Sequence, residues 1–278
     1  MAAVWESHNT SAWASTSTVT ITKPTGLAVG NLLLAIITCR NPGGQTVSLP
    51  TNWTSIYNVT PANGNTVQRA MYKVADSGDV ALSNFSFTIA SGPSDATGGL
   101  ARISGYGNIN ASSTATALNT TTSPLTTGTV TPDRTNCLFI LTAGGGQSGG
   151  ASTPALSGYV LTTDDPTWTE QFEITQANAY TFAVATATRT AETATGTASI
   201  TLSTAPASGD YVIGMIAIAP SLSVTSTPAA ISNFFETFNP LSPAMNKFVV
   251  NTPTTTETTK TLWTAESKPS TSWTNETT

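Results

Sequence analysis

Gly30-Asn31-Leu32-Leu33-Leu34-Ala35-Ile36-Ile37-Thr38 is the longest nearly continuous apolar run in this 278-residue chain. Pro24 and Gly26 precede it and Asn41-Pro42-Gly43-Gly44 follows it, so chain-turning residues bound the run on both sides. The run is too short to cross a bilayer. It predicts a β-strand that is buried on both faces, although periodicity alone does not distinguish such a strand from a buried helical segment.

A second run of the same kind favours the strand. Asn136-Cys137-Leu138-Phe139-Ile140-Leu141-Thr142-Ala143 is again followed by glycines, at positions 144–146. Other segments also recur in the same order: 18–22 and 127–131, Trp53 and Trp168, 71–75 and 181–185, 85–89 and 198–202, 100–104 and 212–217. Their separation of about 105 to 115 residues is too long for a solenoid and predicts a duplicated β unit. Chance similarity between two Ala/Thr-rich segments is the alternative.

The composition indicates a polar surface with few charged residues around a substantial core. Hydrophobic residues make up 39% of the chain, enough for a core, whereas charged residues make up only 9%. The surface must therefore consist largely of Thr, Ser, Asn and Gln, and Thr suits exposed strand faces. A net charge of -5 without a run of Lys or Arg argues against nucleic acid or an anionic membrane as a partner.

The number of cysteines and the amino-terminal residues indicate whether the protein is secreted. Two cysteines in 278 residues do not form a disulfide scaffold, so Cys39 and Cys137 are expected to be buried free thiols. The first eight residues have neither a basic nor an apolar segment of the kind that a signal peptide needs. We therefore expect no signal peptide and no membrane-spanning segment.

The predicted fold is all-β, with two pseudo-repeated antiparallel, jelly-roll-like β-sandwich units followed by an extended arm. Residues 1–107 form the first unit, with a lead-in over 1–17 that Trp5 and Trp13 dock onto it; 108–124 connect the units; 125–221 form the second unit. Tandem or abutting units are favoured over one shared sandwich. The predicted core residues are Leu32, Leu34, Ile36, Phe87, Ile89, Leu138, Ile140, Ile200 and Ile216.

Residues 222–278 are predicted to be an assembly arm. Residues 229–238 carry apolar side chains at helical spacing and form the only predicted helix. The prolines and threonines beyond it have no core of their own, and ordering costs about 1 to 2 kcal/mol per residue, so a partner must supply the order. The expected partner-binding anchors are Phe234, Phe235, Phe248, Trp263 and Trp273. Packing of the two tryptophans on the chain's own sandwich is the alternative.

The sequence offers little for catalysis. His8 is the only histidine, which excludes a Ser-His-Asp triad outside the lead-in and any His-rich metal site. Residues 144–150 are rich in glycine but lack the Lys-Ser/Thr of a phosphate loop, which favours a flexible loop between strands. Asp164-Asp165 is next to Pro166 and favours a turn over half of a carboxylate pair or a calcium site. Trp53, Trp168, Tyr57 and Tyr106 are more typical of core aromatics than of sugar-stacking platforms. We therefore expect no enzymatic activity and no cofactor.

Several of these segments resemble a known module. Residues 22–34, 72–75 and 98–106 are similar to a non-catalytic β-sandwich module of tailed-bacteriophage structural proteins and some bacterial surface proteins. Residues 263–274 resemble the carboxy-terminal ends of small phage virion proteins. The first similarity covers most of residues 18–220 with loose motifs, and Gly30-Asn31 stands where the module usually has Gly-Asp. The resemblance implies a virion structural role and carries no catalytic residues.

Two classes of function remain open. A structural subunit of a virion, in head decoration, tail or fibre, assembles in the host cytoplasm and is released by lysis, which agrees with the missing signal peptide. Its partners would be copies of itself and other virion proteins. The alternative is a carbohydrate-binding or adhesion module that recognises a glycan on the host surface, and the two classes meet in a receptor-binding fibre.

Overall fold

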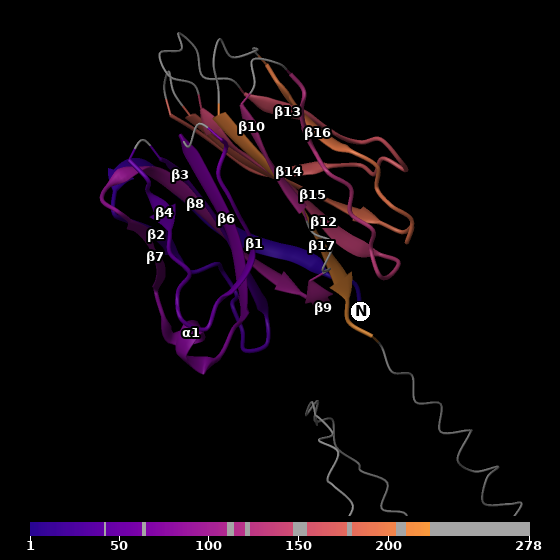
Figure 1. Cartoon of the computed structure of the whole chain (residues 1–278). Helices are drawn as coiled ribbons and strands as arrows, with labels where there is room; N and C mark the ends of the chain where they lie inside the picture. The colour runs from indigo at the N-terminus through magenta and orange to yellow at the C-terminus, as the bar shows by residue number, and fades with distance from the viewer. Residues whose placement is uncertain are drawn as a thin grey trace, which may run out of the picture. The chain divides into compact units, whose positions relative to one another are not determined.

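The computed structural model describes residues 1–41, 43–62, 65–109, 114–119, 123–146, 155–176, 180–203 and 210–222. These residues belong to one compact unit, Met1–Val224. Antiparallel strands provide nearly all of their secondary structure, which confirms the all-β prediction (Figure 1). The described residues include no helix with the length and apolar composition of a membrane span. The helix predicted over residues 229–238 lies outside the described residues.

Four antiparallel sheets contain the strands. The first five-stranded sheet has the order β1-β8-β3-β6-β5, and β2, β7 and β4 form a three-stranded sheet in the order β2-β7-β4. Their bounds are β1 Val4–Thr16, β2 Thr18–Thr22, β3 Leu32–Arg40, β4 Thr46–Val47, β5 Thr54–Val59, β6 Thr66–Val74, β7 Asn84–Ala90 and β8 Ser94–Ser104. We call residues 1–104 the first half.

The second half, residues 106–220, repeats this order. Its large sheet runs β10-β17-β12-β15-β14, with β9 also paired to β17, and its three-stranded sheet runs β11-β16-β13. The bounds are β9 Tyr106–Ile109, β10 Thr114–Asn119, β11 Leu125–Thr127, β12 Cys137–Gly146, β13 Leu156–Leu161, β14 Thr169–Gln176, β15 Tyr180–Arg189, β16 Ala198–Leu202 and β17 Asp210–Pro220. The same strand order therefore occurs twice along the chain, in agreement with the segment pairs matched in the sequence.

The central strand β3 shows why both large sheets are apolar on both faces. Because side chains alternate along a strand, Leu33, Ala35 and Ile37 point to one side, where they pack in a cluster with strands β2 and β7. Leu32 and Ile36 point to the other side and pack in a cluster that includes residues of β12, β15 and β17. A continuous apolar run is the consequence of burial on both sides, so the strand prediction for this run is confirmed.

Three apolar clusters form the core. One joins the two sheets of the first half, another joins the two sheets of the second half, and the third lies between the two large sheets. Every residue predicted to lie in the core is no more than 4% exposed: Leu32, Leu34, Ile36, Phe87, Ile89, Leu138, Ile140, Ile200 and Ile216. The third cluster brings the two halves into contact.

Two segments predicted to lie outside the sheets are strands. The lead-in contains β1, a 13-residue edge strand that pairs with β8 along its length. Trp5 and Trp13 pack against the cluster between the large sheets, so their predicted docking role is confirmed. The predicted connection over residues 108–124 contains β10, which pairs with β17. Backbone hydrogen bonds to a buried neighbouring strand hold both segments, and these bonds need no apolar sequence pattern.

Two local predictions are also wrong. Residues 77–81 form the short helix α1 (Ser77–Ala81), which a capping box stabilises: Asp76 accepts from the Asp79 amide, and the Asp79 carboxylate accepts from the Asp76 amide. Glycines 144–146 belong to the buried strand β12 and not to a loop, while 147–150 lie outside the described residues. A Cβ atom at Gly144 would lie 2.6 Å from Thr38 Oγ1 in the first half, so glycine permits this close approach.

Candidate functional site

A groove of about 600 Å³ lies where the start of β1 meets β14 and β15. Among the described residues, its lining is entirely uncharged: Ala2, Ala3, Val4, Trp5, Leu138, Pro166, Thr167, Thr169, Gln171, Thr186, Ala187 and Thr188. The first four come from the first half and the others from the second half. The groove is therefore built by the contact between the halves, and its chemistry suits a neutral ligand that offers hydroxyl or amide groups.

The indole ring of Trp5 is held in place by an aromatic row. Its Nε1–H donates a hydrogen bond of 3.3 Å to His8 Nδ1, and the centroids of these two rings lie 5.9 Å apart. His8 in turn lies 5.1 Å from the ring centroid of Phe172 on β14. Burial lowers the pKa of His8, which favours the neutral imidazole that accepts from Trp5. A fixed, half-buried indole at the edge of a polar groove is suited to stacking on an apolar ligand face.

The polar wall of the groove comes from the edge strand β14 and its neighbour β15. The register of β14 shifts between Glu170 and Phe172, so Gln171 is the extra residue of a β-bulge. The Gln171 amide nitrogen donates a 2.7 Å hydrogen bond to Thr186 Oγ1. This bond fixes the amide plane of Gln171 beside the exposed Thr169 and Thr188. The wall thus presents ordered amide and hydroxyl groups without formal charge.

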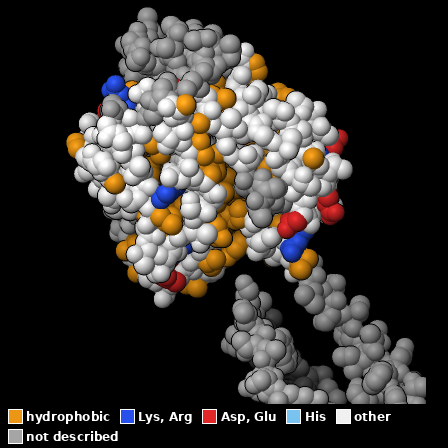
Figure 2. Space-filling view, viewed as in Figure 1, with side chains coloured by type: hydrophobic (Ala, Val, Ile, Leu, Met, Phe, Trp, Pro, Cys, Tyr) orange, Lys and Arg blue, Asp and Glu red, His pale blue; other side chains and the backbone are white. Residues whose placement is uncertain are grey.

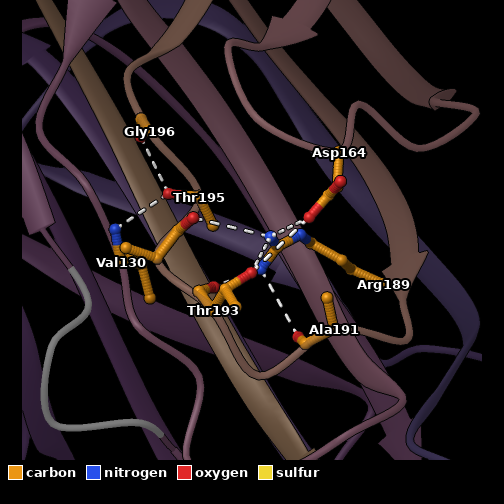
Figure 3. Close-up of polar contacts among 8 residues, drawn as sticks. Val130, Asp164, Arg189, Ala191, Thr193, Thr195 and Gly196 are labelled. Carbon is orange, nitrogen blue, oxygen red and sulfur yellow. Dashed lines mark hydrogen bonds and ion pairs between the residues drawn. The ribbon is translucent and has the colours of Figure 1, made fainter.

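The second cavity, of about 430 Å³, is lined in part by Asp164, Asp165 and Arg189. Figure 3 shows that the Asp164 carboxylate and the oxygen atoms of the loop after β15 surround the Arg189 guanidinium group. Asp164 Oδ2 lies 3.0 Å from Arg189 Nη2, and the guanidinium also donates to the carbonyl oxygens of Thr193 and Ala191. Arg189 is only 3% exposed, so its role is to fasten this loop to the sheet.

Asp165 has a turn-forming role. Its Oδ1 accepts hydrogen bonds from the Leu161 amide at 2.8 Å and from Trp168 Nε1 at 3.1 Å. These bonds bring the end of β13 and the start of β14 together, which confirms the prediction of a turn at Asp164-Asp165. Within the described residues, no group of three or more His, Cys, Asp or Glu side chains could hold a metal ion.

The aromatic residues weighed as sugar platforms lie in the core or against it. Tyr57 is 8% exposed, and Trp53 packs edge-to-face on Phe87 with a centroid distance of 5.4 Å. Trp168 packs against the core of the second half, and Tyr106 against the cluster between the halves. Tyr57 is thus a core aromatic, as predicted, whereas Trp53, Trp168 and Tyr106 are partly buried rings that pack on the core. The ring that lines the groove is Trp5.

The thiols are buried, as the sequence predicts. Cys39 and Cys137 are free and inaccessible, and burial raises their pKa values to about 12 and about 11. A thiol with such a pKa is a poor nucleophile at neutral pH.

The predicted arm anchors are not part of this site. Phe234, Phe235, Phe248, Trp263 and Trp273 all lie outside the described residues, so the structure does not place them. The sequence reasoning missed Gln171, Thr186 and the groove that they line. No signal in the sequence could have revealed them, because Trp5 and Gln171 come from opposite halves of the chain.

Comparison with known proteins found no match: no protein-family model, no curated protein and no solved structure matches this chain. The function must therefore be inferred from the chemistry of the described side chains.

Proposed function

We propose that the chain is a non-enzymatic structural component of a tailed-bacteriophage virion, assembled in the host cytoplasm from copies of itself and other virion proteins. One observation carries the proposal: the Asp164, Asp165 and Asp79 carboxylates take part in structural contacts, and both thiols are buried. Asp164 and Asp165 fasten loops, and Asp79 caps a helix. The resemblance of most of residues 18–220 to a phage module, through loose motifs, agrees with such a role.

The proposed body consists of two jelly-roll-like sandwich units. The repeated strand order and the apolar cluster within each half support this description. Figure 2 shows few charged side chains on the face in view, which suits a protein that packs against neutral neighbours. Residues 222–278 would serve as the assembly arm, with Phe234, Phe235, Phe248, Trp263 and Trp273 as its anchors.

Locating the protein tests the virion proposal. Particles purified by density gradient from the source culture are digested and analysed by mass spectrometry, and an antibody against the described body is used for immunogold labelling. We expect the chain in the particle fraction and gold on head, tail or fibre. Recovery of the chain only outside particles would refute the proposal. In the same system, truncation after Pro220 should abolish incorporation, and normal incorporation would refute the role of the arm.

The groove beside Trp5 favours a second candidate function, binding of a neutral glycan on a host surface. Its uncharged lining, fixed indole and ordered Gln171 amide offer both stacking and hydrogen bonding to a sugar ring. On an oligosaccharide array, the protein should therefore bind neutral oligosaccharides and should not bind acidic ones.

Two variants make the glycan test specific. Trp5→Ala should lose binding, whereas Trp168→Ala should retain it, because Trp168 packs against the core of the second half and does not line the groove. Absence of binding to every neutral glycan, or equal binding by Trp5→Ala, would refute the glycan function and leave the virion proposal standing.

A further inference from the structure

The two large sheets contact each other through a pair of matching contacts. Tyr57 of β5 lies over Gly214 of β17, where an added Cβ atom would be 2.6 Å from the Tyr57 ring carbon Cζ. Phe172 of β14 lies over Gly99 of β8, where an added Cβ atom would be 2.9 Å from Phe172 Cε1. In each case an aromatic ring from the edge of one sheet occupies the space that a glycine leaves in the other sheet.

The four residues hold equivalent places in the two sheets. Residues that pair on neighbouring strands form a row across the sheet. Tyr57 pairs with Ala70, Ala70 pairs with Ile36, and Ile36 pairs with Gly99. Phe172 pairs with Val184, and its row continues through Thr142 to Gly214. These rows contain, in order: Tyr57, Ala70, Ile36 and Gly99 in the first half; Phe172, Val184, Thr142 and Gly214 in the second half.

The backbone that presents each ring is equivalent as well. The register of β5 shifts between Ser55 and Tyr57, and the register of β14 shifts between Glu170 and Phe172. A β-bulge directly before the aromatic residue therefore occurs at the same place in both edge strands. Bulges redirect the side chains that follow them, so this repeated bulge aims both rings at the facing sheet.

Such reciprocity is the property of a two-fold symmetric interface, in which residue i contacts j and j contacts i. We infer that the apolar outer face of each large sheet is a protein-docking surface whose partner is a β unit of the same design. The two halves then associate as the subunits of a symmetric dimer do. Their association depends on the surfaces themselves and does not need the covalent link between β9 and β10.

A buried polar group makes the pairing specific for unlike halves. The Tyr57 hydroxyl lies 2.9 Å from Thr142 Oγ1 and donates to Gln68 Oε1 at 2.8 Å. At the row position equivalent to Thr142, the first half has Ile36, which offers no hydroxyl. In a pair of two first halves, the Tyr57 hydroxyl would keep its bond to Gln68 of its own half but would meet Ile36 in place of Thr142, so the buried hydrogen bond across the interface would be lost. The surfaces therefore favour the pairing seen within one chain.

Cleavage of the folded chain tests this inference. A protease recognition sequence is placed between β9 and β10 in the full-length chain, and the purified protein is cleaved under native conditions. We expect both fragments to elute together from a gel-filtration column at the volume of the uncut protein, and to separate only in denaturant. Separation or precipitation on cleavage would show that the covalent link is needed and would overturn the inference.

After cleavage, β9 belongs to the first fragment and pairs with β17 of the second fragment. This strand pairing could hold the fragments together by itself, so substitutions in the docking surfaces are needed to measure what those surfaces contribute. Gly99→Leu with Gly214→Leu places side chains under both rings and should weaken the fragment pair at least tenfold. Gly128→Leu is the control, because Gly128 is exposed on the second half. If the double variant does not fold, Tyr57→Ala with Phe172→Ala removes the rings instead and should have the same effect. Cleaved variants as tightly associated as the parent would refute the docking surfaces.

Discussion

The Tyr57 hydroxyl lies 2.9 Å from Thr142 Oγ1, and both residues are buried between the two large sheets. Gln68 completes the group: its Oε1 accepts from Tyr57, and its Nε2 donates to Thr38 Oγ1 at 3.1 Å. Burial raises the pKa of Tyr57, so the phenol remains a hydrogen-bond donor at physiological pH. A satisfied network in a low-dielectric interior fixes the register in which the sheets meet.

Tyr57→Phe should lower the free energy of unfolding by about 1 to 2 kcal/mol, because it removes a buried hydroxyl and leaves Gln68 and Thr142 with fewer partners. Urea unfolding followed by tryptophan fluorescence measures the change. Tyr106→Phe is the matched control, since the Tyr106 hydroxyl has no hydrogen bond with the described residues and its ring packs at the same cluster. Equal effects of the two substitutions would contradict the role of the network.

Arg189→Lys should destabilise the protein more than Asp164→Asn. Most acceptors of the Arg189 guanidinium are oxygen atoms of residues 191–194, which a lysine ammonium group cannot bind at the same time. The Asp164 side chain is 60% exposed, so loss of its charge should cost less than about 1 kcal/mol, against about 2 kcal/mol for Arg189→Lys. Thermal unfolding of both variants gives the order, and the reverse order would count against the fastening role of Arg189.

Protonation of His8 should destabilise the native protein as the pH falls. Burial lowers the pKa of folded His8 below its ordinary value of 6.5, so the unfolded chain takes up this proton at a higher pH than the folded chain. Stability is therefore lost as the pH falls below about 6.5 towards the folded pKa.

The variant His8→Phe isolates this effect, because His8 is the only histidine and phenylalanine retains a ring between Trp5 and Phe172. Melting temperatures are measured between pH 7 and pH 5.5, above the range in which ordinary carboxylates titrate. The wild-type value should fall and the variant value should stay level. Parallel slopes in the two proteins would disprove the contribution of His8.

Thiol reagents should not modify the folded protein. Cys39 and Cys137 are fully buried, and their raised pKa values of about 12 and about 11 leave almost no thiolate at neutral pH. Ellman's reagent should detect no thiol in native buffer and both thiols in guanidinium chloride. Rapid reaction of either cysteine in native buffer would show that its strand opens easily.

The sequence was most informative where one strand is buried on both faces. The apolar runs that contain Leu34 and Ile140 could be predicted as central strands because every position along them faces a core. The edge strand β1 could not be predicted, because most of its residues are polar, all of them are exposed or only half-buried, and two register shifts interrupt the alternation. Its place in the sheet depends on backbone hydrogen bonds to β8, which leave no trace in residue type.

The candidate groove could not be predicted for a different reason. Trp5 and Gln171 contribute to one surface only because β1 of one sheet and β14 of the other are brought together by the contact between the halves. Trp5 could be identified as a docking ring from its size and apolar character alone. Its position at a groove is a property of tertiary structure that local patterns do not encode.

The row of residues that contains Tyr57 and the equivalent row that contains Phe172 have different side chains. In a dimer of two identical chains, the two rows would have to be the same. In a dimer of identical chains, every substitution enters both faces at once, so a hydroxyl that helps one face must also be tolerated by the other. Joining the faces in one polypeptide lets each vary by itself. Thr142 can meet the Tyr57 hydroxyl while the equivalent Ile36 stays apolar, so the interface gained a polar contact on one side without burying an unneeded hydroxyl on the other.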